Sequence, residues 1–368
     1  MSRFEFSLAG PGDDAQLRAR MAVDAMEGSI AVSFRREPSY FAGCRLQGDA
    51  TQVVKCVDAA SGRVVGLGSR STAPAYVDGQ RARIGYLSDL RLAPELRRGL
   101  LVARGYRMLR RLHAADPVPF YTTVIYEGNA PAFSALVGAR AGLPRYVDWG
   151  RLLTPAIKLD FAMRQAGLAG IALERGNAAR LPQIVEFLNR ERARKQFAPI
   201  VDTAQFGNGR LAGLGAEAFY LAVRGGRIVG TLAAWDQSDL RQTHVERYPL
   251  VLGLARPLYN ALAALLPLKR LPPPGGRVPY VYLACAAAED DDVNLFRFLM
   301  CAAHESLRRG PWSFAIAALH EADPFAPVLS EFRSVAAAGR LFAVHYPEEP
   351  LAIDPVARRV PCMEAGCL

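Results

Sequence analysis

The chain of 368 residues contains little lysine and histidine, and its cysteines form no recognisable pattern. It has 4 lysines against 41 arginines, 5 histidines, and 6 cysteines without a Cys-x-x-Cys spacing. The absence of this spacing argues against a disulfide framework or a structural zinc site, so we expect free thiols and no metal. No apolar run reaches 18 residues, and we therefore expect neither a membrane-spanning helix nor a membrane partner.

Length and composition indicate a folded protein with more than one core. Half of the residues are hydrophobic and 22% are charged, which excludes a disordered chain. A chain of 368 residues fits two domains of about 150–200 residues each. The start, MSRFEFSLAG, lacks the apolar stretch and cleavage site of a signal peptide, so a cytoplasmic location is expected.

Positive charge is concentrated in one short segment. Residues 91–111 (RLAPELRRGLLVARGYRMLRR) hold seven arginines and one glutamate. The preceding run, 84–92, is typical of a strand, Pro94 sets a turn, and Leu101, Met108, Leu109 and Leu112 recur at helical spacing. A strand, a basic turn and a helix N-terminus together favour binding of an anion such as phosphate, because free N–H groups and the helix dipole meet there. A solvated helix face in an arginine-rich protein is the alternative. Few aromatic residues accompany the arginines, which argues against nucleic acid.

The first half of the chain gives an ordered series of elements. Residues 16–33 carry a helical pattern, and 33–41 a short second helix with its loop. Two apolar runs, 52–59 and 63–70, flank Ala60-Ser61-Gly62 and predict a hairpin. The strand at 83–92, the helix at 100–113 and a strand at 120–127 follow, before Asn129 opens another helix.

This series, with its turn Leu-x-Leu-x-Pro-x-x-Arg-Arg-Gly and an Asn-x-x-Ala-like Asn129-Ala130-Pro131-Ala132, resembles the GCN5-related N-acetyltransferases. The resemblance implies that acetyl-CoA binds as co-substrate at the turn. The implied cofactor-binding residues are Leu90, Arg91, Leu92, Arg97, Arg98, Gly99, Leu100, Leu101, Val102 and Asn129. Amides at Leu90 and Leu92 would hold the pantetheine and the acyl carbonyl. The turn departs from the family pattern, because leucine and valine stand where small residues are usual.

The resemblance implies a reaction that needs a base for the acceptor amine and an acid for the leaving thiolate. Asp89 is the first candidate base, Glu127 the second, and Tyr126 a candidate acid. Paired strand-end carboxylates are the structural alternative for Asp89 and Glu127. The family's frequent tyrosine, seven residues after the asparagine, corresponds here to Leu136, so the ordinary acid is missing. Tyr121 and Tyr146 are substitutes that the sequence leaves open.

The second half repeats the first in outline. A strand at 171–174 and a helix at 177–195 precede a hairpin at 219–235, a strand at 278–289, a helix at 293–309 and a strand at 313–321. We therefore expect an α+β fold of two tandem acyl-CoA N-acyltransferase-like domains, each a mixed, mostly antiparallel sheet flanked by helices. The expected bounds are 1–155 for the first domain, 156–346 for a degenerate second domain, and 347–368 for a tail that wraps over one domain.

Two segments of the second half depart from that outline. Glu289-Asp290-Asp291-Asp292 stands where the first half has arginines; such carboxylates would repel a pyrophosphate, and we interpret them as a solvated helix cap in preference to a Mg²⁺ or Ca²⁺ site. Residues 240–277 are an insertion with an apolar helix, which we expect to pack within the chain, with a pocket wall or a homodimer interface as alternatives.

Three functional hypotheses follow from these features. The first is an N-acetyltransferase that moves an acyl group from acetyl-CoA to the amine of a small molecule or peptide. The second is an acyltransferase whose donor is an acyl-carrier protein or an aminoacyl-tRNA. The third is a non-catalytic binding or regulatory protein. The acceptor cannot be identified from the sequence, and fold analogy alone does not choose among the three.

Overall fold

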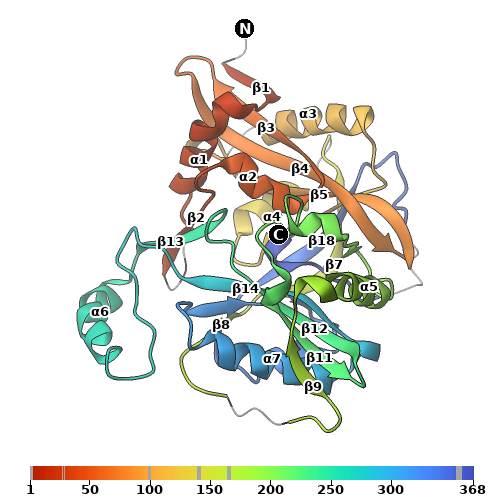
Figure 1. Cartoon of the computed structure of the whole chain (residues 1–368). Helices are drawn as coiled ribbons and strands as arrows, with labels where there is room; N and C mark the ends of the chain where they lie inside the picture. The colour runs from red at the N-terminus through yellow and green to blue at the C-terminus, as the bar shows by residue number, and fades with distance from the viewer. Residues whose placement is uncertain are drawn as a thin grey trace.

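The protein consists of two lobes, each built on one β-sheet, with the end of the chain between them (Figure 1). The computed structural model describes residues 3–26, 28, 30–97, 101–138, 142–163, 167–353 and 359–368. The α-helices of these residues are α1 (Asp14–Val23), α2 (Tyr40–Cys44), α3 (Leu101–Ala115), α4 (Ala130–Leu136), α5 (Leu181–Arg192), α6 (Leu250–Leu262), α7 (Val293–Leu307) and α8 (Ala326–Leu329).

The first sheet is mixed and mostly antiparallel, with the order β1-β3-β4-β5-β6-β18-β7-β16, and β10 pairs with β4. Its strands are β1 (Phe4–Leu8), β3 (Ala50–Asp58), β4 (Arg63–Val77), β5 (Gln80–Leu92), β6 (Tyr121–Tyr126), β7 (Arg145–Leu153), β10 (Ala198–Pro199), β16 (Leu319–His320) and β18 (Ala338–His345).

The second sheet has the order β17-β8-β15-β14-β12-β11-β9. Its strands are β8 (Ala156–Lys158), β9 (Ala172–Arg175), β11 (Phe219–Arg224), β12 (Arg227–Trp235), β14 (Tyr280–Ala288), β15 (Phe314–Ile316) and β17 (Ser334–Val335). A separate antiparallel pair, β2 (Ala31–Arg35) with β13 (Gln242–Arg247), joins one segment from each half of the chain.

The two sheets share a local design, which confirms the tandem fold expected from the sequence. Each contains a parallel pair, β5 with β6 and β14 with β15, connected through a helix. In each, the first strand of that pair carries a one-residue bulge against its antiparallel neighbour, β4 or β12, with Asp89 at φ 56° in β5 and Cys285 at φ 53° in β14. A bulge bends a strand and changes the direction of its backbone groups. This feature therefore occurs at the equivalent position in both lobes.

Strands from the second half of the sequence complete the first sheet. β18 inserts antiparallel between β6 and β7, and β16 adds to β7 at the edge. The predicted strand at 313–321 is therefore wrong as one element, since its two parts serve different sheets. Chain segments far apart in sequence thus tie the lobes together.

Each lobe has its own buried cores, made by the sheet and its helices. In the second lobe, α7 is buried along most of its length, and Phe296 stacks on Phe325 with ring centroids 4.4 Å apart. In the first lobe, Leu109 of α3 packs with Tyr121 and Phe342 of the sheet. Burial of such apolar side chains contributes about 1.5–3 kcal/mol for each one.

Most predicted elements are confirmed, and three further corrections follow. The helix expected at 16–33 ends at Val23, and β2 takes residues 31–35, because β13 supplies a hydrogen-bonding partner that the local pattern cannot show. The helix of the insertion is α6, and it does not pack within the chain as expected: Leu250, Leu254 and Leu258 are each at least two-thirds exposed. The tail packs on the first lobe through Ile353, as expected, but its last residues lie between the lobes (Figure 1).

Candidate acyl-transfer site

The parallel strands β5 and β6 separate immediately after they meet. Their backbones pair only at Gly85 with Tyr121 and at Tyr86 with Thr122. One side-chain bond follows, from Thr123 Oγ1 to the Leu87 carbonyl at 2.8 Å, and β5 then continues to Leu92 without a paired strand on its β6 side. Such an opening between strands offers backbone N–H and C=O groups to an extended ligand.

The bulge in β5 is anchored from inside the first lobe. Asp89, at its positive φ, forms an ion pair with Arg36, and it accepts a hydrogen bond from the Tyr40 hydroxyl at 3.0 Å. Burial lowers the pKa of the Arg36 guanidinium, but the negative charge of Asp89 raises it, and the net effect is an increase. Burial, followed by the charge of Asp89, raises the pKa of Tyr40 far above its ordinary value, so Tyr40 remains protonated. The predicted base is therefore already engaged by two donors.

The basic turn leads from β5 into α3. Arg97 is exposed; its Nε donates to the Leu92 carbonyl at 3.1 Å and its Nη2 reaches Asp24 at 3.3 Å. The Nε atom of Arg91 is buried and has no hydrogen-bond partner among the described residues, a state that a bound anion would relieve. Leu101 and Val102 begin α3 as the structure describes it. Arg98, Gly99 and Leu100 lie outside the described residues.

The remaining predicted residues stand at the far end of β6. Glu127 is paired through both carboxylate oxygens with Arg151, at 2.7 and 3.0 Å, which lowers its pKa. Tyr126 is 40% exposed, and Asn129 caps α4 by accepting from the Ala132 N–H at 3.2 Å. Leu136 is buried in the core.

The two alternative tyrosines are structural. Tyr121 is buried, accepts from Arg70 Nε at 2.9 Å and lies 2.8 Å from His113 Nδ1. Tyr146 is hydrogen-bonded to Tyr106, and burial raises its pKa far above the ordinary value. The hydroxyls of both are thus engaged by other side chains.

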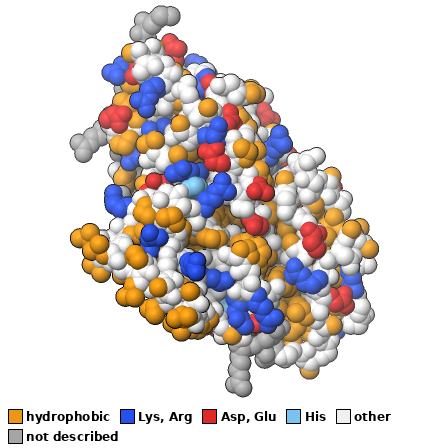
Figure 2. Space-filling view, turned by 60° about the vertical axis from the view of Figure 1, so that its left-hand side comes forward, with side chains coloured by type: hydrophobic (Ala, Val, Ile, Leu, Met, Phe, Trp, Pro, Cys, Tyr) orange, Lys and Arg blue, Asp and Glu red, His pale blue; other side chains and the backbone are white. Residues whose placement is uncertain are grey.

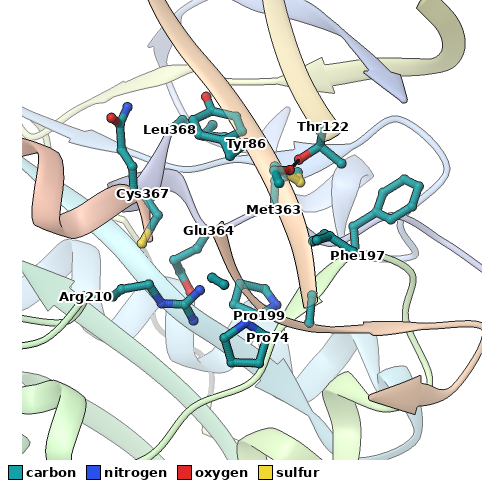
Figure 3. A pocket seen from close by; sticks show the side chains of 15 residues that line it. Pro74, Tyr86, Thr122, Phe197, Pro199, Arg210, Met363, Glu364, Cys367 and Leu368 are labelled. Carbon is teal, nitrogen blue, oxygen red and sulfur yellow. Dashed lines mark hydrogen bonds between the residues drawn. The ribbon is translucent and has the colours of Figure 1, made fainter. Parts of the chain in front are cut away.

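A pocket lies where the two lobes and the last residues of the chain meet (Figure 3). Its walls are mostly apolar with a few polar side chains, a composition that suits a small ligand. The lining comprises Gln47, Ala73, Pro74, Ala75, Ile84, Gly85, Tyr86, Thr122, Phe197, Pro199, Arg210, Met363, Glu364, Cys367 and Leu368. It therefore adjoins the point at which β5 and β6 part.

Tyr86 is one of the polar residues of this pocket that the sequence analysis did not select. Burial, followed by the charge of Asp89, raises its pKa, so the hydroxyl keeps its proton at neutral pH. A protonated phenol can donate to a developing negative charge. Its position in the predicted strand at 83–92 was known, but no local signal distinguished it from the chain's other tyrosines.

The equivalent place in the second lobe is filled by the chain itself. The N–H of Cys285, at the second bulge, donates to Glu364 Oε2 at 3.0 Å. Arg192 holds the same carboxylate oxygen, and both side chains are almost wholly buried. A backbone donor that serves an internal carboxylate is not free for a ligand, so only the first lobe offers an open bulge.

The acidic turn before α7 is also internally satisfied. Asp292 caps the helix by accepting from the Asn294 N–H at 2.8 Å, as expected. The charges are neutralised by neighbours that the sequence did not reveal: Arg227 pairs with Glu289, and Lys195 lies 2.8 Å from Asp291. Within the residues that the structure describes, no group of three or more His, Cys, Asp or Glu side chains could hold a metal ion.

No family model matches the sequence, and no curated protein matches it. Solved structures match the fold over nearly the whole chain. N-myristoyltransferase from Saccharomyces cerevisiae with bound myristoyl-CoA is 11% identical, with a TM-score of 0.64, and the match covers 99% of this chain and 86% of that one. The chain has the fold of the GCN5-related N-acetyltransferase superfamily.

Two further structures match this acetyltransferase fold. The GCN5-related glucosamine N-acetyltransferase region of a fungal multi-domain β-N-acetylglucosaminidase is 11% identical, with a TM-score of 0.58, and the match covers 93% of this chain and 38% of that one. A GCN5-related N-acetyltransferase from Anabaena variabilis is 12% identical, with a TM-score of 0.51, and the match covers 93% of this chain and 72% of that one.

Proposed function

We propose that this protein is a CoA-dependent N-acyltransferase whose first lobe binds the acyl donor. The observation that carries the proposal is the opening of β5 from β6 beyond Tyr86, which leads from the bulge at Asp89 to the basic turn before α3. The opening supplies backbone groups for an amide-rich chain such as pantetheine. The turn supplies arginines and helix N–H groups for a pyrophosphate.

The proposed donor contacts are those the sequence suggested. Backbone groups of Leu90 and Leu92 bind the pantetheine and the thioester carbonyl, and Arg91 and Arg97 bind phosphate together with Arg98. The first turn of α3 completes the phosphate site. The buried Nε of Arg91, which has no acceptor among the residues that the structure describes, supports this assignment, because a buried donor without an acceptor costs about 1–3 kcal/mol.

The acceptor amine enters the pocket between the lobes, at the other side of the opening. There the amine attacks the thioester carbonyl, the C–N bond forms, and the C–S bond breaks to release the CoA thiolate. Tyr86 is placed to donate a proton to the departing sulfur. Asp89 remains the proposed base, acting while bound to Arg36, and Glu127 and Tyr126 are the secondary candidates.

The donor is proposed as acyl-CoA, with acetyl-CoA first among the candidates. The structural neighbour from yeast contains myristoyl-CoA, so a longer chain is tested beside it. We propose thermal unfolding with acetyl-CoA, myristoyl-CoA, free CoA and ATP. A ligand at about 100 times its Kd adds roughly 2.7 kcal/mol, equivalent to a rise of about 5–10 °C.

A charge-reversal variant locates the site. Arg97→Glu with Arg98→Glu is expected to weaken acyl-CoA binding at least about tenfold, because two charge-assisted phosphate contacts are reversed. Arg107→Glu with Arg111→Glu, farther along α3, is the matched control and is expected to retain the shift. A shift with ATP alone, or none with any CoA, would contradict the proposal and favour a carrier-bound donor or a non-catalytic protein.

A further inference from the structure

Helix α6 presents an apolar face that no other described residue covers. Seven large apolar side chains in this helix and the residues after it are between 46% and 84% exposed, and four of them recur every fourth residue, which places these four in one stripe. The seven are Leu250, Val251, Leu254, Leu258 and Leu262, continued after the helix by Leu265 and Leu266. We call these seven side chains the leucine face. The helix projects from the body of the protein (Figure 1), and hydrophobic side chains gather over it (Figure 2).

The opposite side of α6 is firmly built, so the exposure is a property of the folded chain. Asn260 holds the returning loop through both groups of its amide: Nδ2 donates to the Leu271 carbonyl at 3.0 Å, and Oδ1 accepts from the Leu271 N–H at 2.8 Å. Tyr248 donates to the Pro272 carbonyl at 2.7 Å. Lys269 donates to the Arg308 and Gly310 carbonyls at the edge of the second lobe.

The charge of this segment indicates what covers the leucine face. Residues 247–278 contain four arginines and one lysine, and no aspartate or glutamate. Arg270 and Arg277 are exposed. In a symmetric dimer through α6, the same patch would meet itself, and its cations would face each other without a carboxylate from the segment to pair them. An apolar face followed in the chain by the exposed cations Arg270 and Arg277 instead complements a surface of hydrocarbon edged by anions.

We propose that α6 and its following loop dock the protein on an anionic lipid bilayer. The leucine face enters the boundary between headgroups and acyl chains, and Arg270 and Arg277 lie at the level of the lipid phosphates. The 13 residues of α6 extend about 20 Å, less than the hydrocarbon thickness, so the helix lies in the membrane plane. Among the described residues, no helix is long and apolar enough to cross a membrane. The docking is independent of the proposed acyl transfer.

This proposal differs from the sequence expectation of no membrane partner. That expectation rested on the absence of a long apolar run, which concerns spanning and not surface binding. Only the structure shows that the leucines of the insertion point outward.

The test is flotation of the full chain with vesicles of phosphatidylcholine alone and of phosphatidylcholine mixed with phosphatidylglycerol. The wild type is expected to float with the mixed vesicles and to bind the neutral ones much more weakly. Leu254→Glu with Leu258→Glu is expected to reduce partitioning by about tenfold or more, because charges replace two leucines that would enter the bilayer. These positions are exposed, so the variant keeps the wild-type melting temperature.

The matched control is Leu173→Glu with Val335→Glu, which adds the same charge at exposed apolar positions on the two edge strands of the second sheet, β9 and β17. It is expected to bind as the wild type does. Arg270→Ala with Arg277→Ala is expected to lower binding to mixed vesicles about tenfold and to leave neutral vesicles unaffected. Equal wild-type binding to both vesicle types, no binding at all, or a dimer in solution that Leu254→Glu with Leu258→Glu dissociates would overturn the proposal.

Discussion

At the scale of residues, the Arg36–Asp89 pair is the feature that links the fold to the site. Both side chains are largely buried, with 5% and 12% exposed. Arg36 also lies over the ring of Tyr40, 4.8 Å from its centroid. A buried guanidinium depends on its counter-charge, because desolvation of an unpaired ion costs several kcal/mol. The pair therefore holds the bulge from which Leu90 and Leu92 are presented.

We expect Asp89→Asn to lower the free energy of unfolding by about 3 kcal/mol, because it leaves Arg36 buried without a counter-charge. A double-mutant cycle that compares Asp89→Asn, Arg36→Met and the variant with both changes is measured by urea unfolding. The double variant is expected to lose less than the sum of the single losses. Acyl-CoA binding by Asp89→Asn should remain while turnover falls. Additive losses would show that the two side chains do not interact.

At the scale of elements, the junction of β5 and β6 decides where the opening begins. Gly85 faces Tyr121 so closely that a Cβ there would lie 2.0 Å from the ring. The ring is held by Arg70 and His113 through its hydroxyl, so it cannot move aside. A glycine is required at this point of close approach.

Gly85→Ala is therefore expected to lower the free energy of unfolding by about 1–3 kcal/mol through overpacking. Gly68→Ala, on the adjacent strand β4, is the control, because its Cβ would meet nothing closer than 3.7 Å. Chemical denaturation of both variants provides the measurement. Equal stability of the two variants would mean that Tyr121 can relax.

The elements also show how far local pattern reaches. Both hairpins and the helices α3, α5 and α7 were predicted from periodicity and turn residues, because these signals are contained in neighbouring residues. β2 and β18 were missed, because each pairs with strands that are far away in sequence: β2 with β13, and β18 with β6 and β7. The basic turn was recognised as a candidate site, and its described residues stand beside the opening. Tyr86 and Arg36 gained a role only through their neighbours in space.

At the scale of the whole molecule, the last residues act as an internal tie between the lobes. Gly366 offers its carbonyl to Gln237 Nε2 at 2.8 Å and to Arg241 at 3.2 Å. Arg241 also donates to the Gly43 carbonyl of α2 in the first lobe, at 3.3 Å. Burial raises the pKa of the neighbouring Cys367 thiol to about 11, so it remains protonated.

A side chain at Gly366 would disturb this tie. Its Cβ would lie 2.5 Å from both the Trp235 ring and Gln237 Nε2, and Trp235 is fully buried. Gly366→Ala is expected to lower the free energy of unfolding by about 1–3 kcal/mol. Gly12→Ala, whose Cβ would meet nothing within 4 Å, should leave the melting temperature unchanged. A melting temperature for Gly366→Ala equal to that of Gly12→Ala would show that the segment is not tightly packed.

The sequence by itself determined the class of fold, its tandem repeat, the basic turn and the absence of a second one, because periodicity, turn chemistry and charge are written in adjacent residues. The tertiary structure decided the rest. It placed Arg36 against Asp89, filled the second bulge with Glu364, and left the leucine face of α6 outside the core. These outcomes depend on contacts between distant segments, and the free energy of each contact depends on burial that no local pattern specifies.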